Sequence, residues 1–326
     1  MSKGKSINSL MKHIRDKHSV SIVGSSDKKE LLSMGYYHGY KALKFIRRSS
    51  NSLGITDFNQ IKALNDFDKS LKQLLYQPVM DFETALKNYV IDAVVANNNS
   101  DVDYILRHSL LNYRRFAPSS LEHKKALKKS LDLKTRIHGE IAKYYYRDNP
   151  VILHFQNSSR TLPLWAVFEI IDLGTLASFI ESLDSTIRQN LAINLNIYDS
   201  TRDSLALNMI NHIYCIKELR NAIAHNALVF DCRFQNYTLS YAIKQDLSIK
   251  TGINNISFNT ITDYLILLVF YLKSIGTKKT KLKSIINSYE NAVLALDQSL
   301  NNPSMVFRIL GSDIRTKISG LKNYAR

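Results

Sequence analysis

Apolar residues recur every three or four positions along most of the chain, which is the spacing that places them on one face of an α-helix. Residues 58–77 show this pattern clearly. Their apolar stripe consists of Ile61, Leu64, Phe67, Leu71 and Leu74. Because proline has no backbone N–H to donate, Pro78 predicts the end of this helix, and a second helix is expected over residues 79–96.

A long, strongly basic helix is predicted over residues 119–147. Its inward face is expected to consist of Leu127, Leu131, Ile137 and Ile141. Its candidate RNA-binding cations are Lys124, Lys125, Lys128, Lys129, Arg136, Lys143 and Arg147. Cations that track phosphates, next to tyrosines such as those at residues 144–146 that can stack on unpaired bases, are typical of proteins that hold single-stranded RNA. A solvated helix face is the alternative interpretation of this cluster.

The remaining segments predict a mostly helical, all-α fold with one exception. An apolar helix is expected after Pro163, and Gly174 separates it from a shorter one. Asp203 is expected to cap the N-terminus of the next long helix. The alternating pattern of residues 230–243 favours one short β-hairpin. Further helices are predicted at residues 264–299 and 304–324. Trp165, Phe168 and the aromatic residues of 35–40 are expected in the core, because helix-spaced aromatic residues usually pack. Glu83 and Asp66 are expected to bind cations or backbone amides inside the protein.

The chain is strongly basic. Its 326 residues include 44 Lys and Arg against 28 Asp and Glu, which gives a formal net charge of +16. An excess of this size favours a polyanionic partner because each neutralised phosphate releases a counterion. Nucleic acid is therefore the leading candidate for a partner, and a membrane surface is a weaker candidate. The alternative without any partner is that the charge only keeps the protein soluble.

The sequence shows no sign of secretion or of metal binding. No apolar run reaches the roughly 20 residues that a bilayer span requires, and no secretion signal is visible. The two cysteines, Cys215 and Cys232, match no metal or redox spacing, so both are expected to be reduced. We expect a cytoplasmic protein that needs no cofactor, no metal and no disulfide.

The most informative stretch is residues 219–226, Leu-Arg-Asn-Ala-Ile-Ala-His-Asn. RNA is cut by its own 2′-hydroxyl if a base removes the hydroxyl proton, an acid protonates the departing 5′-oxygen and a cation stabilises the phosphate. His225 suits the proton transfers because histidine exchanges protons near neutral pH, and Arg220 suits the phosphate because guanidinium binds its oxygens in a bidentate way. Asn221 lies one helical turn before His225 and can orient its ring.

Spacing limits what this pair can do alone. Arg220 and His225 are five residues apart, about 140° around an ideal helix, so they converge only if the arginine reaches round or the helix end loosens. A second copy across a two-fold interface would supply the missing acid or base, so we expect a homodimer. The same spacing also arises by chance in a chain of this composition, and a histidine near a helix end is more often a cap or a solvent-facing group.

Around these residues the sequence resembles a known family. Residues 219–226 resemble the Arg-Asn-x-x-x-His signature of HEPN-domain ribonucleases. Residues 34–40, Met-Gly-Tyr-Tyr-His-Gly-Tyr, resemble the Gly-Tyr-Tyr-Arg-Leu-Ser-Gly-Tyr box of the Abi-like family of abortive-infection phage-resistance proteins. Further similarities to this family lie at residues 66–71, 81–86, 163–165 and 173–176. These matches follow the order of the family from about residue 30 to residue 230.

The resemblance implies an all-α, HEPN-type helical bundle with additional N- and C-terminal helices. We expect a basic N-terminal segment at residues 1–30, an Abi-like domain at residues 31–260, and C-terminal helices at residues 261–326 that pack on the same body. In the family's pattern, arginines are common where this chain has His38 and Lys87.

The resemblance also implies an activity. Members are metal-independent endoribonuclease toxins of abortive-infection or toxin–antitoxin systems, commonly dimers with a composite site, to which this chain would contribute Arg220, Asn221 and His225. A small structured RNA or a protein antitoxin holds some of them in check. Toxins silenced by nucleotide transfer often carry tyrosine where this chain has Ala227, so that form of control is not expected here.

Two other functions stay open at this point. A basic helical protein of the same family could hold a structured RNA without cutting it, and the high positive charge favours this alternative. A protein-interaction adaptor in phage defence is the third possibility. RNA binding separates the third from the first two, and RNA cleavage separates the first from the second.

Overall fold

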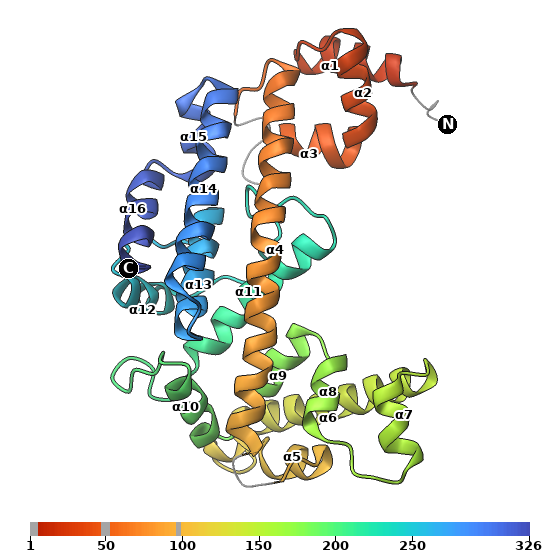
Figure 1. The fold of residues 1–326 in the computed structure, drawn as a ribbon, viewed down its shortest axis with the longest axis vertical. Coiled ribbons are helices and arrows are strands. Elements are labelled where there is room, and N and C mark those ends of the chain that lie inside the picture. The colour runs from red at the N-terminus through yellow and green to blue at the C-terminus, as the bar shows by residue number, and fades with distance from the viewer. Residues whose placement is uncertain (1–5, 47–52, 96–98) are drawn as a thin grey trace. The chain divides into compact units, whose positions relative to one another are not determined.

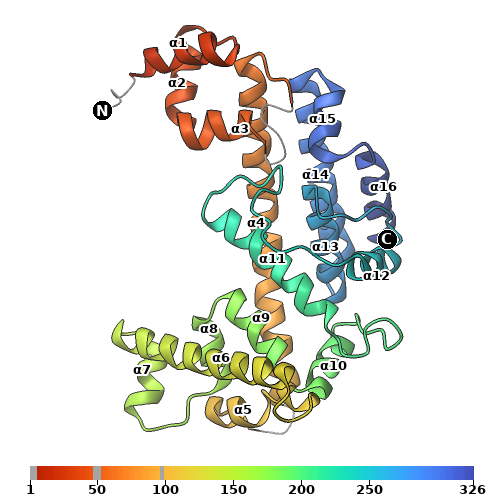
Figure 2. The same ribbon diagram turned by 180° about the vertical axis from the view of Figure 1, so that it is seen from behind.

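The computed structural model describes residues 6–46, 53–95 and 99–326, and within these ranges every regular element is a helix (Figures 1 and 2). The predicted all-α fold is therefore confirmed. The chain forms two compact units: unit 1 comprises Met1–Pro78, Glu218–Lys273 and Thr277–Arg326, and unit 2 comprises Val79–Lys217 and Ser274–Gly276. The domain division at residues 30 and 260 stays a prediction.

The helices are distributed over both units. Unit 1 contains α1 (Ile7–His18), α2 (Gly24–Met34), the π-helix η1 (Tyr36–Lys41), α3 (Ala42–Lys44), α12 (Tyr241–Thr251), α13 (Ile261–Ser274, except its last residue), α14 (Lys279–Leu300), α15 (Pro303–Leu310) and α16 (Ile314–Tyr324). Unit 2 contains α5 (Val102–His108), the 3₁₀-helix η2 (Asn112–Arg115), α6 (Leu121–Tyr146), α7 (Pro150–Asn157), α8 (Leu164–Ile170), α9 (Leu173–Ser182) and α10 (Ser185–Asn194). Both units include residues of α4 (Phe58–Val95) and α11 (Asn208–Ala224). Among the described helices, none combines the length and the apolar character that a membrane crossing requires.

Helix α13 forms the centre of the core of unit 1, since every residue of Ile261–Leu272 is buried. Asp263 within it forms a 2.8 Å ion pair with Lys317 of α16, and both side chains are buried. The second carboxylate oxygen of Asp263 accepts hydrogen bonds from the backbone N–H groups of Ser257 and Phe258 at 3.0 and 2.9 Å. A buried charge is tolerated when its partners are all present, and this one joins α13, α16 and the loop before α13.

Helix α6 packs against η2, α8 and α9 in unit 2. Its fully buried side chains are Ser130, Leu133 and Ile137. Of the four predicted inward residues, Ile137 is buried, two are partly buried, and Leu131 is 52% exposed, so the prediction for Leu131 is wrong. Ser130 takes the inward position beside it, where its hydroxyl donates to the carbonyl oxygen of Leu110 at 3.3 Å.

Pro78 does not end a helix. Helix α4 continues from Phe58 to Val95 with the proline inside it, so the predicted break is wrong; Ala96 lies outside the described residues. The buried stripe of α4 continues through Leu71, Leu75, Pro78, Val79, Phe82 and Leu86. A proline inside a helix costs about 3 kcal/mol. Burial of large apolar side chains at roughly 1.5–3 kcal/mol each offsets that cost.

Residues 230–243 form a loop and the start of α12, so the predicted β-hairpin is wrong. The backbone N–H groups here bind a carboxylate in place of a partner strand: Glu218 accepts hydrogen bonds from Asn236 and Tyr237 at 3.0 and 3.2 Å. Cys232 has a φ of 56°, which lies outside the strand region.

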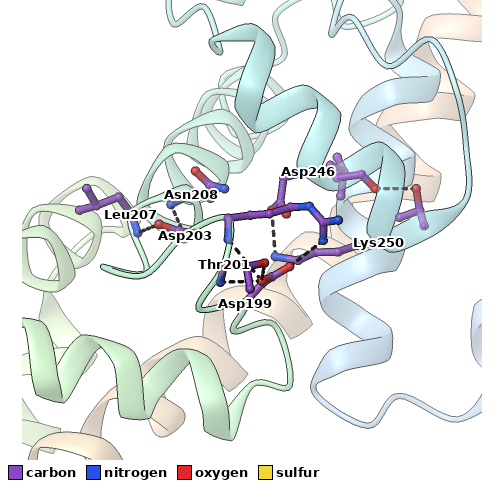
Figure 3. A network of polar contacts seen from close by, with 10 residues as sticks. Asp199, Thr201, Asp203, Leu207, Asn208, Asp246 and Lys250 are labelled. Atoms are coloured by element: carbon purple, nitrogen blue, oxygen red, sulfur yellow. Dashed lines mark hydrogen bonds and ion pairs between the residues drawn. The ribbon is translucent and has the colours of Figure 1, made fainter.

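A hydrogen-bonded turn precedes α11 in unit 2 (Figure 3). Asp199 accepts hydrogen bonds from the hydroxyl and the backbone N–H of Thr201 at 2.6 and 3.0 Å, and it forms a 2.8 Å ion pair with Arg202. These donors lower the pKa of Asp199 to about 2, and the Thr201 hydroxyl has the largest effect. The turn therefore keeps its carboxylate ionised well below neutral pH.

Carboxylates also cap the helices on either side. Asp203 accepts hydrogen bonds from the backbone N–H groups of residues 207 and 208 at 2.7 and 2.8 Å, so it caps α11 as predicted, although the helix itself begins at Asn208. Asp172 caps α9 by accepting from the N–H of Thr175 at 2.6 Å. The break between α8 and α9 therefore lies just before Asp172, and Gly174 lies inside the first turn of α9.

Candidate functional site

Helix α11 ends in a turn closed by two backbone hydrogen bonds. Asn226 has a φ of 53°, its N–H donates to the carbonyl oxygen of Ile223 at 3.1 Å, and the N–H of Ala227 donates to that of Ala222 at 2.8 Å. This is the Schellman arrangement, in which one left-handed residue directs the chain away from the helix axis. Asparagine adopts that region more readily than most residues. His225 is the last residue before the turn.

The three predicted site residues lie at this end of α11. His225 is exposed, whereas Arg220 and Asn221 are partly buried. The N–H of His225 donates to the carbonyl oxygen of Asn221 at 2.9 Å, so the backbone stays helical as far as His225. Asn221 and His225 therefore share one face, as predicted. Because the helix does not loosen before His225, Arg220 can meet it only by the reach of its own side chain or through a second copy.

A buried carboxylate of α4 holds the loop that follows His225. Asp68, with a side chain only 1% exposed, accepts hydrogen bonds from the backbone N–H groups of residues 229 and 230 at 2.7 and 3.0 Å. Lys72, one turn further along α4, lies 2.9 Å from the other oxygen of Asp68 and donates to the side-chain oxygen of Asn226 at 2.6 Å. Neither residue was predicted from the sequence as part of the site, although Asp68 lies within the Abi-like similarity at residues 66–71.

The aromatic box at residues 34–40 folds largely as the π-helix η1. Gly35 precedes η1 with a φ of 76°, and its carbonyl oxygen accepts the N–H of Tyr40 at 3.0 Å. A Cβ on Gly39 would overlap the backbone carbonyl of Met34, so this close approach requires glycine. The backbone of η1 therefore explains why glycines stand at positions 35 and 39 of the box. Turns of π-helix are frequent at functional sites.

Two tyrosines of η1 face the interior of unit 1. The rings of Tyr36 and Tyr40 stack with centroids 5.7 Å apart, and Tyr40 stacks on His18 of α1 at 5.6 Å. The Tyr40 hydroxyl lies 2.9 Å from Nδ1 of His18. Burial raises the pKa of Tyr40, and the neighbouring Tyr36 raises it further. These contacts fix η1 against α1, while Tyr37, between the two, is 68% exposed.

Residues of η1, α3 and the loop after α11 line an open cavity of about 470 Å³ within unit 1. Its lining consists of Tyr37, His38, Lys41, Ala42, Phe45, Asn226, Ala227, Leu228 and Arg233. Nζ of Lys41 lies 5.8 Å from the ring centroid of Tyr37, and the His38 ring meets the Tyr37 ring edge-on at 5.3 Å. None of the described residues that line this cavity is acidic, so it favours an anion.

The predicted RNA-binding cations of α6 lie in unit 2. Exposed side chains on this helix and at its C-cap are Lys124, Lys125, Lys128, Lys129, Arg136, Lys143 and Arg147. Three of these form ion pairs at 2.6–2.7 Å: Lys128 with Asp132, Lys129 with Glu181, and Lys143 with Glu140. Their exposure agrees with a docking surface, and their acidic neighbours agree equally with a solvated helix face, so RNA binding by α6 stays a prediction.

Several residues that the sequence analysis noted have roles inside the protein. Lys87 forms a 3.4 Å ion pair with Glu83 and donates to the carbonyl oxygen of Ile171 at 3.1 Å. It therefore fixes α4 to the end of α8. Cys215 and Cys232 are both buried, and they are not joined to each other in a disulfide. Within the described ranges, no group of three or more His, Cys, Asp or Glu side chains could hold a metal ion.

Other predictions for aromatic and acidic residues need correction. Trp165 and Tyr37 were expected in the core, but they are 46% and 68% exposed; Phe168 is buried as expected. Asp66 was expected to bind cations or amides internally, but it is exposed, and Asp68 two residues later has that role.

Comparison with known families identifies one match. A family model described as Abi-like protein matches residues 29–231, well over half of the chain. The matched region includes η1, the Asp68 and Lys72 pair, and the end of α11. No curated protein and no solved structure matches the chain.

Proposed function

The chain belongs to the Abi-like protein family, and from this premise we propose that it is a metal-independent endoribonuclease of the HEPN type. The family suggests a role in abortive-infection phage defence. One observation carries the proposal: His225 is exposed at the turn that ends α11, directly before a residue that lines a cavity with cationic and aromatic side chains. A polyanion with unpaired bases is the ligand that suits such a lining.

The residues at the end of α11 have complementary roles in this reaction. His225 removes the proton of the 2′-hydroxyl or protonates the 5′-oxygen, and Arg220 stabilises the charge on the phosphate. Asn221 orients the imidazole from one turn away. The 2′-oxygen forms a bond to phosphorus as the bond from phosphorus to the 5′-oxygen breaks. The products are a 2′,3′-cyclic phosphate and a 5′-hydroxyl, and no further reactant is needed.

The Arg220 and His225 motif of one copy contributes one histidine for two proton transfers. We therefore include a homodimer in the proposal, in which the second copy supplies the other histidine and a second arginine across a two-fold axis. The straight course of α11 as far as His225 favours this arrangement, because it keeps Arg220 of the same copy on a different part of the helix circumference. Control by a small structured RNA or a protein antitoxin, and a cytoplasmic location, remain expectations of the family resemblance.

The direct test is cleavage of RNA by the purified protein in excess chelator. Wild-type protein is expected to cut RNA and to spare DNA, which lacks the 2′-hydroxyl. His225→Ala and Arg220→Ala are each expected to lower the rate by about 10²–10⁴-fold, the range typical of lost acid–base or charge-stabilising groups. His154→Ala, which removes an exposed histidine of α7, is the matched control and should keep wild-type activity.

The same experiment separates the alternatives. Cleavage by His225→Ala at the wild-type rate would refute the assignment. Tight, salt-sensitive binding of RNA that is recovered intact from both wild type and His225→Ala would select the protein that holds RNA without cutting it, which the exposed cations of α6 favour. Failure of the wild type to bind RNA at physiological salt would favour an adaptor.

A further inference from the structure

The cavity beside α11 has two chemically different parts. Aromatic rings come from Tyr37 and Phe45, and positive charge comes from Lys41 and Arg233. Arg233 already forms a 2.9 Å ion pair with Asp231 and donates to the carbonyl oxygen of Phe45 at 3.3 Å, so its charge is largely offset. Lys41 is therefore the main cation available to a ligand, and it lies against the Tyr37 ring.

We propose that this cavity binds one unpaired nucleotide of an RNA strand, with the base stacked on Tyr37 and the phosphate beside Lys41. The cavity volume of about 470 Å³ lies within the usual range of small-molecule sites, roughly 300–1,000 Å³. The position of this nucleotide next to the bond that is cut rests on the proposed ribonuclease function. Binding of the nucleotide does not.

Tyr37 supports a base as the ligand. It is 68% exposed, whereas Tyr40 of the same π-helix is fully buried. Gly39 and the stacked pair Tyr36 and Tyr40 hold η1 in one orientation, so the Tyr37 ring projects from a rigid element. A rigid exposed ring with a neighbouring cation is a stacking platform for bases.

The lining also supports a nucleotide over a purely apolar ligand. No acidic side chain among the described lining residues would repel a phosphate. Asn226 brings an amide that can hydrogen-bond a base edge, and its side-chain oxygen is held by Lys72 at 2.6 Å, which fixes the amide in place. Lys72 is itself paired with Asp68, so the lining at this end is held from α4.

An unpaired nucleotide fits better than a base pair. In a duplex both faces of each base are covered by its neighbours, so a tyrosine can stack on a base only where the strand is single or bulged. The cavity is lined by residues of η1 and α3 together with residues 226–228. We therefore expect single-stranded RNA or a loop to enter it, and a continuous duplex to be excluded.

The test measures RNA affinity in the His225→Ala background, in which the proposed function predicts that RNA is not cut. A fluorescently labelled single strand and a duplex of the same sequence are titrated and followed by anisotropy. Tyr37→Ala is expected to weaken binding of the single strand by about 5- to 100-fold and to leave duplex binding unchanged, as expected for loss of one stacked base. Tyr37→Phe keeps the ring and should bind like its parent.

Two further variants complete the design. Lys41→Gln should weaken single-strand binding and reduce its dependence on salt, because one phosphate contact is lost. Tyr241→Ala is the matched control: Tyr241 of α12 is 80% exposed in the same unit but lies outside the cavity, and its loss should have no effect. Thermal melting of each variant checks that the fold is intact.

The outcomes distinguish this inference from the proposed function. If Tyr37→Ala binds the single strand as tightly as Tyr241→Ala does, or loses duplex binding equally, the inference is overturned while the ribonuclease proposal stands. If wild-type protein cuts no RNA but Tyr37→Ala still loses single-strand binding selectively, the nucleotide site stands without the nuclease. Absence of any RNA binding by the parent protein overturns the inference.

Discussion

Two cationic regions of the molecule differ in how their charges are arranged. The face of α6 in unit 2 carries many exposed cations, and three of them pair with acidic neighbours. The end of α11 in unit 1 has fewer cations, but it combines an exposed histidine with a cavity, an aromatic ring and a buried carboxylate that holds the loop. Charge alone attracts any polyanion, whereas this second arrangement can orient one.

The difference explains what each region can contribute. Exposed side chains on a helix track a phosphate backbone without fixing its register, and their ion pairs are worth about 0–1 kcal/mol each. Polar groups held by buried hydrogen bonds keep their geometry, and geometry is what an acid, a base and a phosphate clamp require. We therefore propose that unit 1 carries the chemistry and that α6 contributes no more than docking.

The largest effect is expected at the buried carboxylate. Asp68→Asn removes the charge partner of Lys72 and leaves an amide N–H donor facing either the Lys72 ammonium or the backbone N–H groups, so the free energy of unfolding should fall by about 3 kcal/mol. Urea denaturation measures the change. Asp66→Asn, on the exposed side of the same helix, is the matched control and should change stability by no more than about 0.5 kcal/mol. Equal losses in the two variants would show that Asp68 is not a structural anchor.

Two glycines should respond in opposite directions. Gly39→Ala forces a Cβ against the Met34 carbonyl, so stability should fall by about 1–3 kcal/mol and η1 should shift. Gly139→Ala places its Cβ in open space on helix α6, so stability should rise by about 0.5–1 kcal/mol. Thermal unfolding of both variants compares the close-packed region with the exposed one. Stabilisation by Gly39→Ala would contradict the close approach.

A smaller effect is expected at α6. Replacing Lys124, Lys125 and Arg136 with glutamine leaves the three ion pairs of α6 intact and should barely change stability. RNA binding should weaken equally for single strands and duplexes, and its salt dependence should fall by about 0.7 per lost contact on single strands. Titrations at several salt concentrations provide the measurement. A loss confined to single strands would mean that α6 recognises bases, contrary to our assignment.

The smallest effect concerns the exposed turn at Asp199. The folded protein lowers the pKa of Asp199 from its ordinary value of 3.8 to about 2. The ionised carboxylate therefore stabilises the folded protein at pH values above 3.8, and this stabilisation is lost as the pH falls toward 2. Asp199→Asn should therefore be slightly less stable than wild type at neutral pH, and the difference should fade between pH 4 and pH 2. Melting curves across this range test it, and a difference that does not change with pH would contradict it.

Much of the site could be predicted because it lies within one segment. The end of α11 is encoded locally: the apolar stripe, the Asn221 and His225 spacing and the turn residue Asn226 all stand within a few turns. The cavity could not be predicted in the same way, since η1 and residues 226–233 are distant in sequence and meet only through tertiary packing.

The errors have a physical cause as well. Two of the wrong predictions came from local rules. Proline was expected to end a helix at Pro78, and the apolar side chain of Leu131 was expected to face inward. Packing overrides both rules, because the stripe of α4 is long enough to offset a missing hydrogen bond, and Ser130 satisfies its hydroxyl in the interior. The hairpin at residues 230–243 failed because carboxylates such as Glu218 bind its backbone N–H groups, which a pattern of apolar residues does not reveal.

The chemistry at the ends of cleaved RNA tests the central claim most directly. RNA digested by the purified protein in excess chelator is analysed by mass spectrometry, with His225→Ala as the reference. The account predicts fragments that end in a 2′,3′-cyclic phosphate and begin with a 5′-hydroxyl, formed only when His225 is present. Fragments with a 3′-hydroxyl and a 5′-phosphate, or identical fragments from His225→Ala, would contradict attack by the 2′-hydroxyl at the end of α11.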